Sequence, residues 1–143
     1  MERRDYLLRM LEDLGRVMAR VRELVLGQSH AAATQELERA AARAGLALPL
    51  VQALAGDGLA AVLTTAGRPD PVKYLLAAEY LTVEGLRAAP PDDAALFGRA
   101  LALYRGIGPL RDTSLQAAVA DRITDLERRV AAPHSPLSGG TLR

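Results

Sequence analysis

A chain of 143 residues is long enough for one domain with a sizeable core, and too short for two domains to be expected. Hydrophobic residues make up 50% of it but aromatic residues only 3%, so Ala, Leu and Val must build the core, which favours closely packed helices over a sheet. The formal net charge of +1 creates no field that would attract nucleic acid or an anionic membrane surface. Cysteine is absent, which excludes disulfides, thiolate zinc sites, iron–sulfur clusters and cysteine nucleophiles.

The N-terminal sequence bears on the cellular location of the protein. Charged residues precede an amphipathic segment there, whereas a secretory signal needs an uninterrupted apolar stretch followed by a cleavage site. No apolar run reaches the length of a membrane span. We therefore expect a soluble, cytoplasmic protein with no membrane and no nucleic-acid partner.

Residues 5–26 predict the helix around which the rest of the chain is organised. Apolar residues recur there every three or four positions, at Leu7, Leu11, Leu14, Met18, Val21 and Val25 and again at Met10, Val17 and Leu24. The predicted helix begins near Glu2, ends at Gly27 and is about 33 Å long over residues 5–26. Gly15 in its interior costs up to about 1 kcal/mol relative to alanine. Either the helix tolerates this glycine or a neighbouring backbone approaches closely there, and we favour the close approach.

A second helix is expected to follow directly. Ser29 is suited to its N-cap and Gly45 to its end, with alanines and Leu37 on its apolar face. Prolines and glycines then divide the next segment into two short predicted helices, over 49–55 and 58–66. A strand near 61–65 is the alternative, but it would have no strand to pair with.

The next two predicted helices form a hairpin. Asp70 followed by a proline is typical of an N-cap and first helical residue, and predicts a helix that continues to about Ala89. Two prolines end it, and Asp92 or Asp93 then caps a helix over 92–105.

A last helix and a tail complete the chain. Thr113 to Gln116 has the pattern of a capping box at the start of this helix, and Pro133 ends it. Residues 133–143 lack periodicity and are rich in Pro, Ser and Gly, so we expect a disordered tail after a single helical domain over 1–132.

Helices joined by short loops predict an all-α array of antiparallel helical hairpins packed on the long N-terminal helix. Two segments carry spacings found in tetratricopeptide repeats, namely Ala33-x3-Leu37-x2-Ala40 and Phe97-x2-Ala100-Leu101. The small residue before the second segment, Ala94, is one position out of place, and neither segment has the expected tryptophan. Repeat ancestry and chance in an alanine-rich chain both explain these spacings.

The order of these segments resembles a known family. The stretch from Asp5 to Arg20, DYLLRMLEDLGRVMAR, is followed by the Ala33/Leu37/Ala40 helix, a glycine-punctuated middle, a D-P-initiated helix and an F-x-x-A-L helix. In this it resembles an uncharacterised bacterial family of small helical proteins with tetratricopeptide-like hairpins. The likeness covers Met1 to Tyr104 in order and spacing, and its first 16 residues or so are the specific part. As the family has no assigned reaction, substrate or cofactor, the resemblance implies a fold and no active site.

Two sets of charged residues are candidates for a site. Glu79 lies close to the apolar face of its predicted helix, and a buried carboxylate with a shifted pKa would mark a site. We favour instead a glutamate in water or paired with an arginine. Arg9, Arg16 and Arg20 follow one side of the first helix, as an anion-binding row would. The acidic residues of the same helix favour intrahelical ion pairs over such a row.

The remaining polar residues predict no chemistry. His30 and His134 have no carboxylate or second histidine at helical spacing, and the glycines match no nucleotide-binding fingerprint. Asp5 and Tyr6 suit the first turn of a helix for structural reasons. We therefore expect no enzyme and no catalytic, cofactor-binding or metal site.

These expectations lead to three functional hypotheses. The first is a non-catalytic helical interaction module that binds a partner protein or peptide. The alternative is a homo-oligomer, such as a homodimer, whose interface is the heptad-like seam of the helix over 5–26. The third, an enzyme or small-ligand binder, would need a closed polar pocket around Glu79. We expect the second and fourth helices to share the wide apolar face of the first, and a partner or second copy to use any surface left over.

Overall fold

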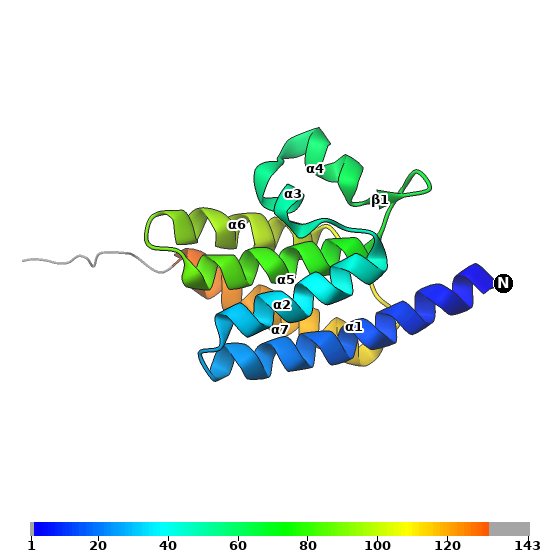
Figure 1. The fold of residues 1–143 in the computed structure, drawn as a ribbon, viewed down its shortest axis with the longest axis horizontal. Helices are drawn as coiled ribbons and strands as arrows, with labels where there is room; N and C mark the ends of the chain where they lie inside the picture. The colour runs from blue at the N-terminus through cyan, green and yellow to red at the C-terminus, as the bar shows by residue number, and fades with distance from the viewer. Residues whose placement is uncertain (1, 132–143) are drawn as a thin grey trace, which may run out of the picture.

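The computed structural model describes residues 2–131, so the predicted tail and His134 lie outside the described residues. Figure 1 shows a helical molecule, which confirms the all-α class. The helices are α1 (Glu2–Leu26), α2 (His30–Ala44), α3 (Leu48–Ala53), α4 (Gly56–Val62), α5 (Pro71–Arg87), α6 (Asp92–Arg105) and α7 (Thr113–Ala131), with two short strands, β1 (Thr64–Thr65) and β2 (Arg68–Pro69). None of these helices is long and apolar enough to cross a membrane.

Several helix ends follow the predicted local chemistry. The long first helix ends one residue before Gly27, and Gly45 ends α2 with a φ of 75°. The Asp70 carboxylate accepts hydrogen bonds from the backbone N–H groups of Val72 at 2.9 Å and Lys73 at 3.4 Å. Ser29 holds the N-cap position of α2, but its side chain makes no capping hydrogen bond.

The start of α7 differs from the prediction. Asp112, not Thr113, caps this helix, because its Oδ1 accepts a hydrogen bond from the Leu115 N–H at 2.9 Å. The Gln116 side chain reaches back to the Leu110 N–H at 2.7 Å. The N-cap of α6 also differs from the prediction. Pro91 holds that position, and Asp92 and Asp93 form the first turn of the helix.

A small hairpin replaces the end of the predicted helix over 58–66. Thr64 pairs with Pro69 and Thr65 with Arg68, so the rejected strand does find a partner. Ala66 and Gly67 connect the strands with φ values of 53° and 77°, the two positive values that a tight hairpin turn of type I′ requires.

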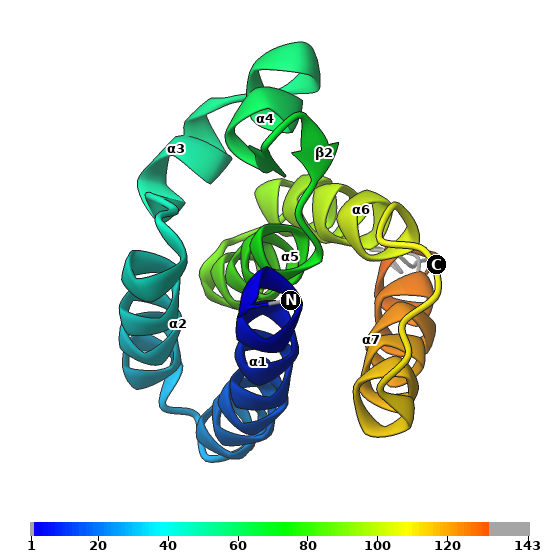
Figure 2. The ribbon, with the colours of Figure 1, turned by 90° about the vertical axis from the view of Figure 1, so that its right-hand side faces the viewer.

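Helix α5 lies at the centre of the molecule, and α1, α2, α3 and α6 all pack against it (Figure 2). Helix α1 packs against α2, α5 and α7, so the expected contact with the second helix is confirmed. The expected contact with the fourth helix is wrong, because α4 packs near α3 and β1 and contributes no buried residue. Helices α2, α5 and α7 cover the apolar face of α1 instead. Leu14, Met18 and Val21 of this face are buried in the common core.

Two helical glycines have opposite surroundings. A β-carbon on Gly85 of α5 would lie 2.6 Å from Cε1 of Phe97, so the missing side chain lets α6 come close. A β-carbon on Gly15 of α1 would meet no atom of the neighbouring elements within 4 Å. The close approach expected at Gly15 is therefore wrong for this chain's own helices.

Arg99 of α6 holds the segment between α2 and α5 in place. Its guanidinium donates hydrogen bonds to the carbonyl oxygens of Val51 at 2.6 Å, Leu54 at 2.7 Å and Gln52 at 3.1 Å. These carbonyls lie at the C-terminal end of α3, where a cation is favourable. The segment that holds α3, α4 and the hairpin thus lies across α5 from the space between α1 and α7 (Figure 2).

Candidate functional site: a groove between helices α1 and α7

Three hollows of about 610, 670 and 480 Å³ follow one another along α1. The first lies between α1 and the loop 109–112 before α7, and the other two lie between α1 and α7. Glu12 and Asp112 line both the first and the second hollow. Arg22, Asp121 and Arg122 line both the second and the third. Because neighbouring hollows share walls, they form one continuous surface feature, which we call the α1–α7 groove.

The α1–α7 groove has an exposed leucine at each end and small residues in its middle. Leu8, with 48% of its surface exposed, lies at one end, and Leu26, with 71% exposed, lies at the other. The middle is lined by small residues on both walls, Gly15 and Ala19 on α1 and Ser114 and Ala118 on α7.

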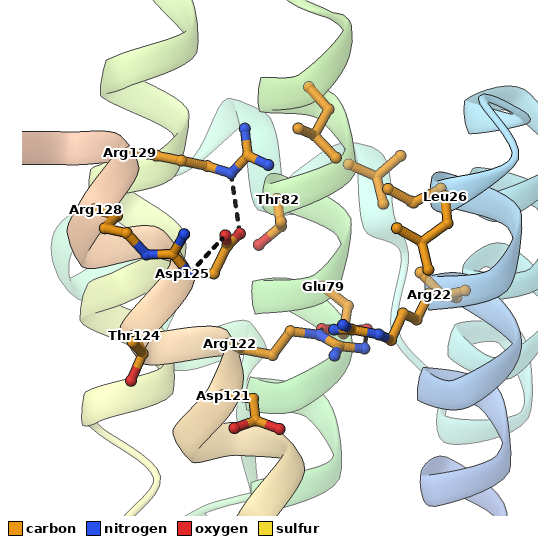
Figure 3. A pocket seen from close by; sticks show the side chains of 14 residues that line it. Arg22, Leu26, Glu79, Thr82, Asp121, Arg122, Thr124, Asp125, Arg128 and Arg129 are labelled. Carbon is orange, nitrogen blue, oxygen red and sulfur yellow. Dashed lines mark hydrogen bonds and ion pairs between the residues drawn. The ribbon is translucent and has the colours of Figure 1, made fainter. Parts of the chain in front are cut away.

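Arg122 crosses the floor of the groove from α7 to α5 and α1 (Figure 3). Its Nε donates to Oε2 of Glu79 at 2.8 Å, and its Nη2 lies 3.2 Å from Oε1. The same Nη2 donates to the carbonyl oxygen of Met18 at 3.0 Å. One side chain therefore ties together the three helices that form the walls and floor.

Glu79 is buried, with only 1% of its surface exposed. The Tyr104 hydroxyl donates to Oε2, so protein donors engage both carboxylate oxygens. The interpretation as an arginine-paired glutamate is thus confirmed, and the alternative, a glutamate exposed to water, is wrong. Oε2 accepts two of these hydrogen bonds and Oε1 accepts one.

Burial and charge keep the Tyr104 phenol protonated and the Arg122 guanidinium charged. Burial raises the pKa of the Tyr104 phenol well above its ordinary value, and the negative charge of Glu79 raises it further. Burial by itself lowers the pKa of Arg122, but the Glu79 charge and hydrogen bonds more than compensate, so the pKa is raised overall. A tyrosine that stays protonated and an arginine that stays charged act as a fixed tie, not as a proton carrier.

The charges at the rim of the groove differ in their pairing. Asp125 of α7 pairs with Arg128 at 3.6 Å and with Arg129 at 2.9 Å. Within residues 2–131, Arg22 on α1 and Asp121 on α7 form no salt bridge. Figure 3 shows Arg22 extending from α1 toward Arg122, whose own charge Glu79 balances. The middle of the groove therefore offers a cation on one wall and an anion on the other.

The arginines expected to form a row do not converge on one site. Arg16 pairs with Asp13 at 2.7 Å and Arg20 with Glu23 at 3.3 Å, which confirms intrahelical pairing. Arg20 also approaches α2, whereas Arg16 lines the α1–α7 groove, and Arg9 is exposed. The part of the chain that the structure describes contains no group of three or more His, Asp or Glu side chains placed to hold a metal ion.

No family model, curated protein or solved structure matches this chain. Its function must therefore be argued from the groove. Sequence reasoning missed the groove residues Ala19, Arg22, Asp121 and Arg122, which look like ordinary polar or small positions on amphipathic helices. Gly15 was noted as an unusual residue in a long helix, but for a close backbone approach that the structure does not have.

Proposed function

We propose that this protein is a non-catalytic helical interaction module that binds a partner protein or peptide in the α1–α7 groove. The observation that carries the proposal is the continuity of the groove along α1, from Leu8 at one end to Leu26 at the other. The engagement of Glu79 by Arg122 and Tyr104 supports a structural role for the charged cluster at its floor.

The arrangement of helices supports a tetratricopeptide-like module. Helices α1 and α2 pack together, as do α5 and α6, and α7 follows as a further helix. The groove is lined by α1 and α5, which are the first helices of the two pairs, and by α7. Repeat proteins built from helical hairpins use such a concave surface for binding, so this likeness argues for the same use here.

The alternative, a homo-oligomer formed through the seam of α1, receives less support. Leu14 and Val21 of that seam are at most 3% exposed, because the chain's own helices cover them. A second copy would have to use other residues.

Substitutions that fill the groove test the proposal. Ala19 is exposed on the wall of the groove, and Ala42 is exposed on α2 outside it, so Ala19→Arg and Ala42→Arg form a matched pair. The full chain serves as bait in the organism that expresses it. We expect a partner that the wild type and Ala42→Arg retain and Ala19→Arg loses, and which slows amide hydrogen exchange along α1 and α7. Equal retention by both variants, or no retained partner, would contradict the proposal.

A further inference from the structure

The walls of the α1–α7 groove restrict the conformation of whatever lies in it. Helices α1, α5 and α7 line its middle and its Leu26 end, and the loop 109–112 lines its Leu8 end. The backbone N–H and C=O groups within helices already bond to each other. The described strands, β1 and β2, lie on the other side of α5 (Figure 2). An extended segment would find few backbone partners, whereas a helix satisfies its own backbone.

The dimensions of the groove fit one helix. Its α1 wall runs from Leu8 to Leu26, which at 1.5 Å per residue is about 27 Å, or five helical turns. Helix axes must come within about 8–10 Å of each other to pack. Small side chains on both walls, at Gly15, Ala19 and Ala118, leave that room in the middle of the groove.

The side chains of the groove also indicate the chemistry of this helix. Leu8 and Leu26 are far apart, so an occupant needs an apolar side chain near each of its ends. Between them, Arg22 on the α1 wall would attract a carboxylate and Asp121 on the α7 wall would attract a cation.

We infer that the occupant is a single amphipathic α-helix of a partner protein, about five turns long, with an acidic residue facing Arg22 and a basic residue facing Asp121. This inference rests on the proposed function and names the class of partner. The small residues of both walls are then the place where the partner helix packs most closely.

Two peptide libraries displayed on phage test the inference against the full chain. One library encodes 20-residue amphipathic helices without proline, and the other encodes extended proline-containing peptides of the same length. Selected peptides are synthesised and their affinity is measured by fluorescence anisotropy. We use Gly15→Trp to block the groove, since a side chain there meets open space, and Ala42→Trp as the matched control on α2. Circular dichroism serves to check that both variants are folded.

We expect the helical library to yield binders that become helical on binding. Gly15→Trp should lower their affinity by about tenfold or more, and Ala42→Trp should leave it unchanged. Arg22→Glu should weaken peptides that carry an acidic residue in the middle, and replacing that residue by arginine should restore binding to this variant.

Other outcomes would overturn the inference in distinguishable ways. Extended peptides that Gly15→Trp displaces would keep the groove as a binding site but exclude a helix. Helical peptides that bind Gly15→Trp as well as the wild type would place their site elsewhere. No binder from either library would count against the proposed function itself. A dimer in light scattering that Gly15→Trp dissociates would assign the groove to a second copy of this chain.

Discussion

The ring of Phe97 on α6 fills the space beside the α-carbon of Gly85 on α5. The guanidinium of Arg129, from α7, lies 5.6 Å from the centre of the same ring. One aromatic side chain therefore joins three helices near the Leu26 end of the α1–α7 groove.

Alanine at the two helical glycines should have opposite effects on stability. Gly85→Ala places a methyl group 2.6 Å from the Phe97 ring and should cost about 1–3 kcal/mol of unfolding free energy. Gly15→Ala meets open space and should gain up to about 1 kcal/mol from its better helix propensity. Urea denaturation measures both. A neutral Gly85→Ala would show that Phe97 yields easily, and Gly85→Ala with Phe97→Leu should recover part of the loss.

Removing Arg122 should destabilise the fold strongly. Arg122→Met leaves the buried Glu79 carboxylate without its ion pair, which should cost about 3–5 kcal/mol. The double variant Glu79→Leu, Arg122→Met removes both charges and should recover most of that loss. Arg16→Met, which breaks an exposed pair on α1, is the control and should cost less than about 1 kcal/mol. Equal losses from Arg122→Met and Arg16→Met would show that the buried pair stabilises the fold no more than an exposed pair does.

Stability should fall in alkaline solution because of Tyr104. Its pKa is raised in the folded state, so the unfolded chain releases this proton near pH 10 while the folded chain keeps it. Its contribution is complete below pH 10 and is lost above it, at about 1.4 kcal/mol per pH unit. Urea titrations between pH 9 and 11 should show a slope that is shallower in Tyr104→Phe. The slope that remains includes Tyr80, whose pKa burial also raises.

The cap of α7 can be checked with neighbouring substitutions. Asp112→Ala removes the acceptor for the Leu115 N–H and should cost about 0.5–2 kcal/mol. Thr113→Ala changes an exposed side chain inside the first turn and should stay within about 0.5 kcal/mol. Thermal unfolding of both variants decides which residue caps the helix, since the reverse order would support the predicted capping box.

The sequence predicted the helix ends that depend on neighbouring residues alone. Asp70 before a proline and Gly45 after an amphipathic segment act over three or four residues, so their effect can be seen in the chain itself. The hairpin was missed because Ala66 stands at a turn position with positive φ, where asparagine or glycine is the usual signal.

The site could not be predicted because it depends on contacts across the chain. Glu79 was recognised as close to the apolar face, but its partner Arg122 is 43 residues away. The α1–α7 groove is defined by what does not cover Gly15 and Ala19, and local periodicity carries no information about a missing neighbour.

The anchoring of α3 by Arg99 has a practical consequence for handling the protein. The hairpin beyond α3 carries Arg68, which is exposed and lines a hollow with Tyr6 and Met10 of α1. The chain has no cysteine, so Arg68→Cys would create a single thiol. Coupling through that thiol would attach every molecule to a surface through the same point on the hairpin.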